Sequence, residues 1–303
     1  MVTFFNKASF SNVIIALLCS FIFASALPLE VEDIQNYLNR IILIDSDEYV
    51  PGIFFIWDEF FLVVYNLVGE KYLIFSIRFI LYLFLTLTCL KELNLKVYIV
   101  LILVSPFIIE HFLGGLRQGL AFVLFITAYY NSNKIVRICI FGAIVFIHPL
   151  ALWWLGTYLL ALFAFKFNSK FILFGLSIFC FLMLKSVFSS PYVQSILMYG
   201  ERYEFADSGR SVFGLLFWIL ILFLTLLIKE RKLHTYVVIL SLLQLIILYN
   251  NFESIYRFFQ SLLPIFLIYN LNNYKNKYSK IIILLYTLFV GIHFTTYYPK
   301  LLL

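Results

Sequence analysis

Long apolar runs separated by short polar turns occupy most of the chain. A helix needs roughly 20 residues to cross the hydrocarbon core of a membrane, so the shorter runs, of about 13 to 16 residues, need flanking aromatic or polar residues to span. The pattern predicts helices throughout. The runs are Phe10–Leu29, Ile53–Val68, Tyr72–Leu90, Val97–Ile109, Leu116–Tyr130, Ile135–Ile147, Leu150–Phe165, Phe171–Leu184, Val212–Ile228, Tyr236–Tyr249, Tyr256–Tyr269 and Ile281–Phe294.

Composition turns this pattern into a fold class. Of the 303 residues, 63% are hydrophobic and 13% are charged, and the mean hydropathy is +0.99. A soluble domain cannot bury that much apolar surface, which predicts an all-α polytopic membrane protein. The net charge of +6 does not indicate nucleic-acid binding, because Lys and Arg gather in the cytoplasmic loops of membrane proteins.

The basic turns fix an expected topology. Lysine and arginine concentrate after alternate runs, and such turns stay cytoplasmic. They agree with one another only if Ile53–Val68, interrupted by Trp57-Asp58-Glu59, is a re-entrant or interfacial helix on the outer side. We therefore expect about 11 transmembrane helices in one domain, residues 1–303, with a cytoplasmic N-terminus and outward loops at 30–71 and 185–211. The basic residues are Lys91, Lys96, Lys134, Arg137, Lys166, Lys170, Lys229, Arg231, Lys232, Lys275, Lys277 and Lys280.

The sequence allows two interpretations of the first run, a cleaved signal peptide or an uncleaved first span. Ala24-Ser25-Ala26 resembles a signal-peptidase site, whereas the single Lys7 before the run favours an uncleaved first span. The next loop faces outward in either case.

The hairpin from His111 to His148 holds the principal candidate site. Arg117 begins one run directly after Gly114-Gly115, and His148 ends the next, so both lie at the outer end. A guanidinium at a helix N-terminus suits phosphate oxygens, although an arginine near a span end also snorkels to lipid headgroups. His148 is a candidate general acid or base, a hydrogen-bond donor to substrate, or a simple capping residue.

Further polar residues gather on the same expected face. Glu253 and Arg257 share a helix face, either as an ion pair or as a base and a phosphate clamp. Arg202 and Arg210 lie in an aromatic-rich loop and are solvated or bind sugars. Asp58 and Glu59 either bind sugar hydroxyls, act as a general base, or are exposed at the interface. His111 is a further candidate for substrate binding on this face.

No metal site or cofactor is expected. The histidines are scattered, and the carboxylates lack metal-ligand spacing. The four cysteines have no CxxC partner and are expected to be buried, unpaired thiols: Cys19, Cys89, Cys139 and Cys180.

Several segments resemble the EpsG family of Wzy-type polysaccharide polymerases. Gly115-Leu116-Arg117-Gln118-Gly119-Leu120-Ala121 looks like that family's Arg-Gln-x-Leu-Ala motif, and Ala143 to Ala151, with His148, resembles its following span. Asp33-x-x-x-Tyr37, Glu48-x-x-Pro51-Gly52 and Tyr256-Arg257-Phe258 are similar to its other motifs.

The resemblance implies a function and a location. Such enzymes join undecaprenyl diphosphate-linked repeat units at the outer face of the bacterial plasma (inner) membrane, with membrane lipids and a chain-length regulator as partners. The fold would be that of membrane glycosyltransferases that use lipid-linked donors. Arg117 and Arg257 would hold the diphosphate, His148 or Glu253 would assist the acceptor hydroxyl, and Gln118 and Asp33 would contact substrate.

Three other functions remain open. A transporter or flippase of the lipid-linked saccharide predicts a repeated half and polar residues through the midplane. A membrane acyltransferase needs an acyl-donor path from the cytoplasm. A ligase uses chemistry close to polymerisation.

Overall fold

Described residues and element order

The structure is a computed structural model that describes residues 9–26, 38, 39, 41, 55–113, 115–148, 150–188, 212–228, 230, 232–248 and 262–297. Within these residues all regular elements are helices and no strand occurs, which confirms the all-α prediction. The elements are α2 (Phe10–Ala26), α4 (Phe55–Val68), α5 (Glu70–Glu92), η1 (Lys96–Tyr98), α6 (Ile99–Leu103), α7 (Pro106–Leu113), α8 (Leu116–Tyr129), α9 (Lys134–Val145), α10 (Leu150–Lys166), α11 (Lys170–Phe188), α13 (Val212–Leu226), α14 (Leu233–Leu248), α16 (Leu263–Asn272) and α17 (Lys277–Tyr297).

The chain forms two compact units. The first contains Met1–Leu152 and Thr287–Leu303, and the second contains Trp153–Tyr286. That residues 1–303 form one transmembrane domain stays a prediction.

The first unit

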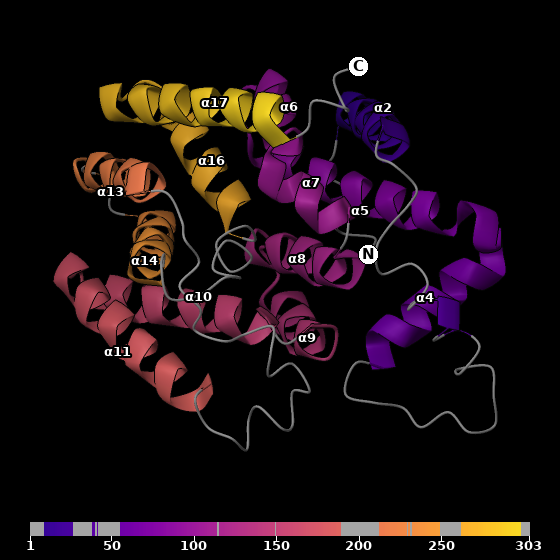
Figure 1. The fold of residues 1–303 in the computed structure, drawn as a ribbon, viewed down its shortest axis with the longest axis horizontal. Coiled ribbons are helices and arrows are strands. Elements are labelled where there is room, and N and C mark those ends of the chain that lie inside the picture. The colour runs from indigo at the N-terminus through magenta and orange to yellow at the C-terminus, as the bar shows by residue number, and fades with distance from the viewer. Residues whose placement is uncertain are drawn as a thin grey trace. The chain divides into compact units, whose positions relative to one another are not determined.

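Helix α5 is the centre of the first unit. Helices α2, α4 and α8 all pack against it, and Figure 1 shows α5 as a long helix beside α7 and α8. Its 23 residues extend about 34 Å at 1.5 Å per residue, which is enough to cross a bilayer core of about 30 Å.

Helices α5 and α8 run parallel. At one level, the ring of Phe112 in α7 lies 4.4 Å from the ring of Tyr82 in α5 and 6.4 Å from that of Phe122 in α8. Further along both helices, the hydroxyls of Thr88 and Thr127 are 3.1 Å apart. Arg117 precedes Thr127 in α8 by as many residues as Arg78 precedes Thr88 in α5. The two arginines therefore lie at the same level along the parallel helices.

Gly69 makes the corner between α4 and α5. Its φ of 73° and ψ of 172° lie in a region that is essentially restricted to glycine. Its backbone N–H donates to the Tyr65 carbonyl oxygen over 2.8 Å, so α4 ends there and α5 leaves at an angle (Figure 1). The helix predicted over Ile53–Val68 is therefore present as α4, while its outward, re-entrant placement stays a prediction.

The run predicted as one helix over Val97–Ile109 is broken. Helix α6 ends at Leu103, and α7 starts at Pro106. A proline lacks the N–H that a helix interior needs, and its ring disfavours helical geometry in the residue before it. Pro106 therefore ends one helix and begins the next.

The second unit

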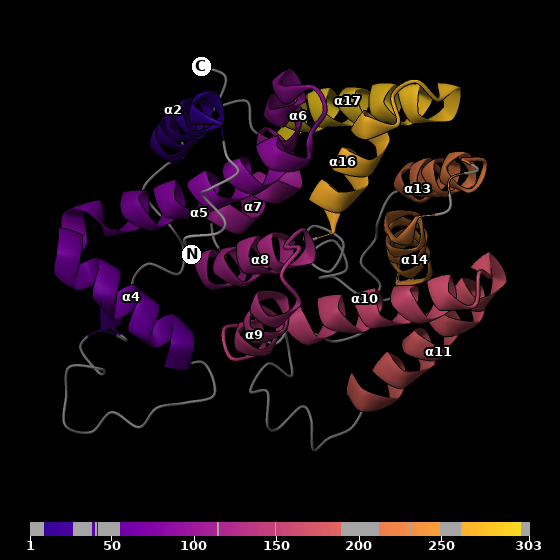
Figure 2. The ribbon, with the colours of Figure 1, turned by 180° about the vertical axis from the view of Figure 1, so that it is seen from behind.

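Helix α14 is the centre of the second unit. It packs against α11, α13 and α16, and Thr157 of α10 donates from its hydroxyl to the side-chain oxygen of Gln244 in α14 over 3.0 Å. Figure 2 shows α10, α11, α13 and α14 from the reverse side. Several buried hydroxyls in this unit donate to the carbonyl four residues earlier in their own helix, namely those of Ser177, Thr225 and Ser241.

Surface and cysteines

Large apolar side chains are exposed along many helices, while polar ones are buried. Phe171 is 88% exposed and Phe213 is 83% exposed, whereas Arg78, Thr86 and Asn270 are fully buried. Among the described helices, α5 is the one that is long and apolar enough to cross a membrane, judged by length and composition alone. The shorter apolar helices include α2, α8, α10, α13, α14 and α16.

The prediction that the cysteines are buried is confirmed for Cys89, is met in part by Cys19 and is wrong for Cys139. Cys89 is buried, Cys19 is half-buried and all three described thiols are unpaired, but Cys139 is exposed. Cys139 follows Ile138 on the exposed apolar face of α9, so an apolar neighbourhood in the sequence did not mean burial here. The side chain of Cys180 lies outside the described residues.

Candidate functional site

The basic turns lie together

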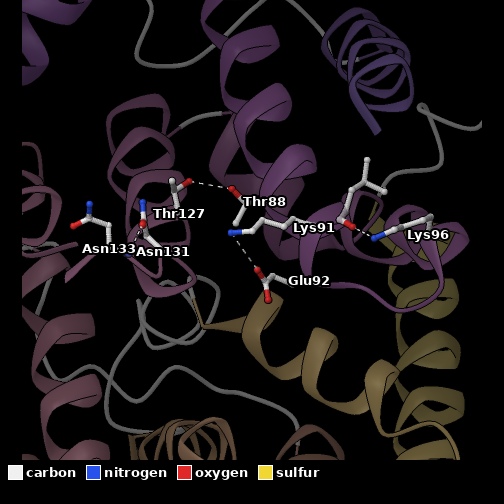
Figure 3. Close-up of polar contacts among 8 residues, drawn as sticks. Thr88, Lys91, Glu92, Lys96, Thr127, Asn131 and Asn133 are labelled. Carbon is white, nitrogen blue, oxygen red and sulfur yellow. Dashed lines mark hydrogen bonds and ion pairs between the residues drawn. The ribbon is translucent and has the colours of Figure 1, made fainter. Parts of the chain in front are cut away.

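Two basic turns of the first unit share one end. The Thr88–Thr127 contact brings the end of α5, with Lys91 and Lys96, beside the turn between α8 and α9 (Figure 3). Lys96 caps α5 by donating from Nζ to the carbonyl oxygens of Leu90 and of Leu93, the latter over 2.8 Å. Partial burial lowers the pKa of Lys96, and the Glu92 carboxylate raises it in part.

The turn between α8 and α9 is built by two asparagines. Asn131 accepts from the backbone N–H of Asn133 over 2.9 Å (Figure 3). Asn133 in turn caps α9, since its side-chain oxygen accepts from the N–H groups of Ile135 and Val136. The cap places Lys134 and Arg137 in the first turn of α9, next to the end of α5.

The second unit gathers its basic turns in the same way. Tyr236, in the first turns of α14, donates to Asn168, which lies between Lys166 and Lys170. Glu230, between the other basic residues 229–232, binds Lys232 and accepts from Asn273 beside Lys275. Among the described residues, each unit thus has its basic turns close together, while their cytoplasmic location stays a prediction.

The opposite end of the first unit

The hairpin predicted from the sequence is confirmed. Helices α8 and α9 pack together, and the rings of Phe125 and Phe141 stack at 5.7 Å. Antiparallel pairing through these two rings places Arg117 close to the level of His148. Arg117 and His148 therefore lie at the same end, away from the basic turns.

Arg117 occupies the first turn of α8. Gly115 precedes the helix, and the Gly119 N–H donates to the Gly115 carbonyl oxygen over 2.7 Å. The Arg117 side chain is half-buried. The free N–H groups of a helix start add partial positive charge, so the guanidinium and the backbone together favour an anion here.

Gln118, the next residue, is buried with its amide nitrogen unsatisfied. It is 5% exposed, and its Nε2 has no hydrogen-bond partner among the described residues. The hydroxyls of Tyr82 and Thr86 in α5 share this condition. An unsatisfied buried group costs about 1–3 kcal/mol, and the described part of the second unit contains such groups as well, among them Asn270 and Ser279.

Arg78 is a site residue that the sequence analysis missed. It lies in the middle of the apolar run of α5 and is fully buried, and its Nε donates to the Phe112 carbonyl oxygen over 2.7 Å. That carbonyl belongs to the last turn of α7, so Arg78 caps this helix shortly before the start of α8, which carries Arg117. A lone arginine inside an apolar run is itself a signal of function.

His148 acts as a helix cap. Its Nδ1 accepts from the backbone N–H of Leu150 over 3.2 Å, at the start of α10. In a neutral ring this assigns the proton to Nε2. The Nδ1 lone pair cannot take a substrate proton without breaking the cap, so this arrangement favours capping and donation from Nε2 over general-base chemistry.

Asp58 and Glu59 lie in different environments. Asp58, in the first turn of α4, is 1% exposed, whereas Glu59 is exposed. The interpretation of Asp58 as an exposed interfacial residue is therefore wrong, because the α4 face that carries Trp57 and Asp58 turns inward. Binding of sugar hydroxyls by Asp58 stays a prediction.

The other predicted site residues are placed less completely. His111 lies within α7. The remaining candidates lie outside the described residues, and these are Asp33, Arg202, Arg210, Glu253 and Arg257. The structure thus brings Arg117, Gln118 and Arg78 to one level, with His148 at the same end.

Comparison of the chain with protein families, with curated proteins and with solved structures gives no match.

Proposed function

We propose that this chain is a multi-pass membrane glycosyltransferase of the Wzy type, acting at the outer face of a bacterial plasma membrane. It would transfer a glycan from undecaprenyl diphosphate onto the terminal sugar of another lipid-linked repeat unit, as the resemblance to the EpsG family implies. Residues and packing support this proposal at three levels.

The distribution of side chains supports a membrane location. Large apolar side chains on α11 and α13 are exposed, and buried hydroxyls such as those of Ser177 and Ser241 bond to their own helix. Lipid favours this arrangement, since it solvates apolar groups and offers no partner to polar ones.

The shared ends of the basic turns support the topology. Lysine and arginine near span ends face the cytoplasm. If the end of the first unit that carries Lys91, Lys96 and Lys134 is cytoplasmic, the end that carries Arg117 and His148 faces outward.

The observation that carries the proposal is the position of Arg117. Arg117 lies in the first turn of α8, next to Gln118 in the sequence, and the register of α5 and α8 puts it level with Arg78. Arg117 is level with a point on α5 that lies about 12 Å from the first residue of that helix, at 1.5 Å per residue. This is deeper in the membrane than a contact with lipid headgroups requires. A fixed cation at membrane depth suits a diphosphate leaving group in a partly dry site.

The transfer exchanges one bond for another. The bond between the anomeric carbon of the donor glycan and the diphosphate oxygen breaks, and a new bond forms to the acceptor hydroxyl oxygen. That hydroxyl loses its proton, and undecaprenyl diphosphate leaves. Arg117 and Arg257 would neutralise the leaving group, and Glu253 becomes the preferred base because Nδ1 of His148 caps α10.

Deletion of the gene tests this function in the source bacterium. We expect the ladder of polymerised glycan on a gel to disappear, while a single repeat unit still reaches its carrier. A retained ladder that lacks an acyl group would identify an acyltransferase instead. Repeat units trapped on the cytoplasmic side would identify a flippase.

A further inference from the structure

We propose that Arg78, Tyr82 and Gln118 form the buried half of the diphosphate site, so that arginines on two parallel helices bind the leaving group. This inference rests on the proposed function. It adds a buried cation and two neutral donors to the two arginines, Arg117 and Arg257, that the proposed function assigns to the diphosphate.

The first support is the level at which these residues lie. The Thr88–Thr127 contact sets the register of α5 and α8, and it places Gln118 between the levels of Arg78 and Tyr82. Tyr82 follows Arg78 by one helical turn, so both lie on the same face of α5, and the two side chains are close enough to interact electrostatically. Phe112 contacts both residues from α7.

The second support is the unsatisfied state of two of these groups. The Tyr82 hydroxyl and the Gln118 amide nitrogen are more than nine-tenths buried and have no hydrogen-bond partner in the described part of the chain. Other buried hydroxyls, such as that of Thr225, donate to a carbonyl of their own helix, although the Ser279 hydroxyl and the Asn270 side-chain oxygen in the second unit also have no partner among the described residues. Buried polar groups in native proteins are paired with protein, water or a ligand, so these two groups point to a ligand.

The hydrogen-bonding groups of Arg78, Tyr82 and Gln118 favour a phosphate as the ligand. An amide nitrogen and a guanidinium only donate, and a tyrosine hydroxyl donates readily. A sugar hydroxyl would need acceptors as well, whereas a phosphate offers only acceptor oxygens at neutral pH. Several donors beside a buried cation therefore fit a diphosphate.

A hydrogen bond within the protein holds the Arg78 side chain in place. Its Nε–H is held by the Phe112 carbonyl oxygen over 2.7 Å, which fixes the plane of the guanidinium. A planar group held in this way loses little freedom when it binds an anion. The same bond fixes the corner from which α8 and Arg117 begin.

Isosteric variants separate ligand binding from folding. The full-length protein is purified in detergent, and its affinity for farnesyl diphosphate is measured by calorimetry. We expect Tyr82→Phe and Gln118→Met each to weaken binding about tenfold, as for one lost hydrogen bond to a charged group. The thermal midpoint of the ligand-free protein should stay unchanged or rise, because each change removes an unsatisfied buried group.

Tyr236→Phe is the matched control, since the Tyr236 hydroxyl is bound to Asn168 in the second unit. It should lower the midpoint and leave the affinity unchanged. If Arg117→Ala abolishes binding while Tyr82→Phe and Gln118→Met bind like the wild type, the further inference fails and the proposed function stands. If the wild type does not bind farnesyl diphosphate, both fail.

Discussion

At the scale of the residue, Arg117 is defined by its geometry as well as its charge. It lies in the first turn of α8 and is half-buried. A lysine would keep the charge and lose the planar fork that matches two phosphate oxygens. The distinction between phosphate binding and contact with lipid headgroups therefore rests on this one substitution.

We expect Arg117→Lys to lower polymerisation by at least about tenfold, the effect of one lost charged hydrogen bond. The measurement is the length of the glycan ladder after complementation of the deletion strain. Arg137→Lys, in the first turn of α9 at the other end of the hairpin, is the control and should restore a full ladder. Full rescue by Arg117→Lys would return Arg117 to a contact with headgroups.

His148 is expected to act through the helix that it caps. His148→Asn keeps a side-chain acceptor for the Leu150 N–H, so it should retain most of the stability and activity. His148→Ala should cost about 1 kcal/mol of stability, as for a lost N-cap. Thermal unfolding and ladder assays on both variants check this, and an Asn variant that is stable but inactive would restore His148 as a catalytic group.

At the scale of the element, the apolar pattern predicted most helices to within a few residues. The expected Leu116–Tyr130 is α8 at Leu116–Tyr129, and the expected Ile135–Ile147 is α9 at Lys134–Val145. The pattern failed at Ser105-Pro106, where proline interrupts an otherwise continuous apolar run. The proline itself was the available signal.

Contacts between distant elements were beyond the reach of the sequence. Arg78 and Phe112 are separated by 34 residues, and only the packing of α5 against α7 brings them together. The same holds for the level that Arg78 shares with Arg117. The arginine inside an apolar run was visible, but its partner was not.

The corner between α4 and α5 provides a test at this scale. We expect Gly69→Ala to destabilise the protein by about 1–3 kcal/mol, because the backbone of residue 69 is in a conformation that essentially only glycine adopts. Apart from residue 69 and its two neighbours in the chain, nothing lies within 4 Å of the added methyl, so the cost is backbone strain. Thermal unfolding in detergent measures it.

Gly142→Ala in α9 is the matched control. Its added methyl also meets open space, and its backbone is helical. It should therefore stabilise by up to about 1 kcal/mol. Equal effects of the two changes would argue against the strained corner.

At the scale of the whole molecule, the basic turns predict the topology. In each unit the basic turns share one end, which we expect to be cytoplasmic. A reporter fused after Val68 should therefore read outside, and one fused at Ser132 should read inside. The opposite pair of readings would place Arg117 in the cytoplasm and remove its access to an outward-facing lipid-linked donor.

The most direct test of the central claim is reconstitution. The purified protein is placed in liposomes with undecaprenyl diphosphate-linked repeat units, and the lipid-linked products are resolved by size. We predict a ladder of multiples of the repeat unit together with one released undecaprenyl diphosphate for each bond formed, and no ladder with Arg117→Lys. Repeat units that cross the bilayer or gain an acyl group but stay single would contradict the account.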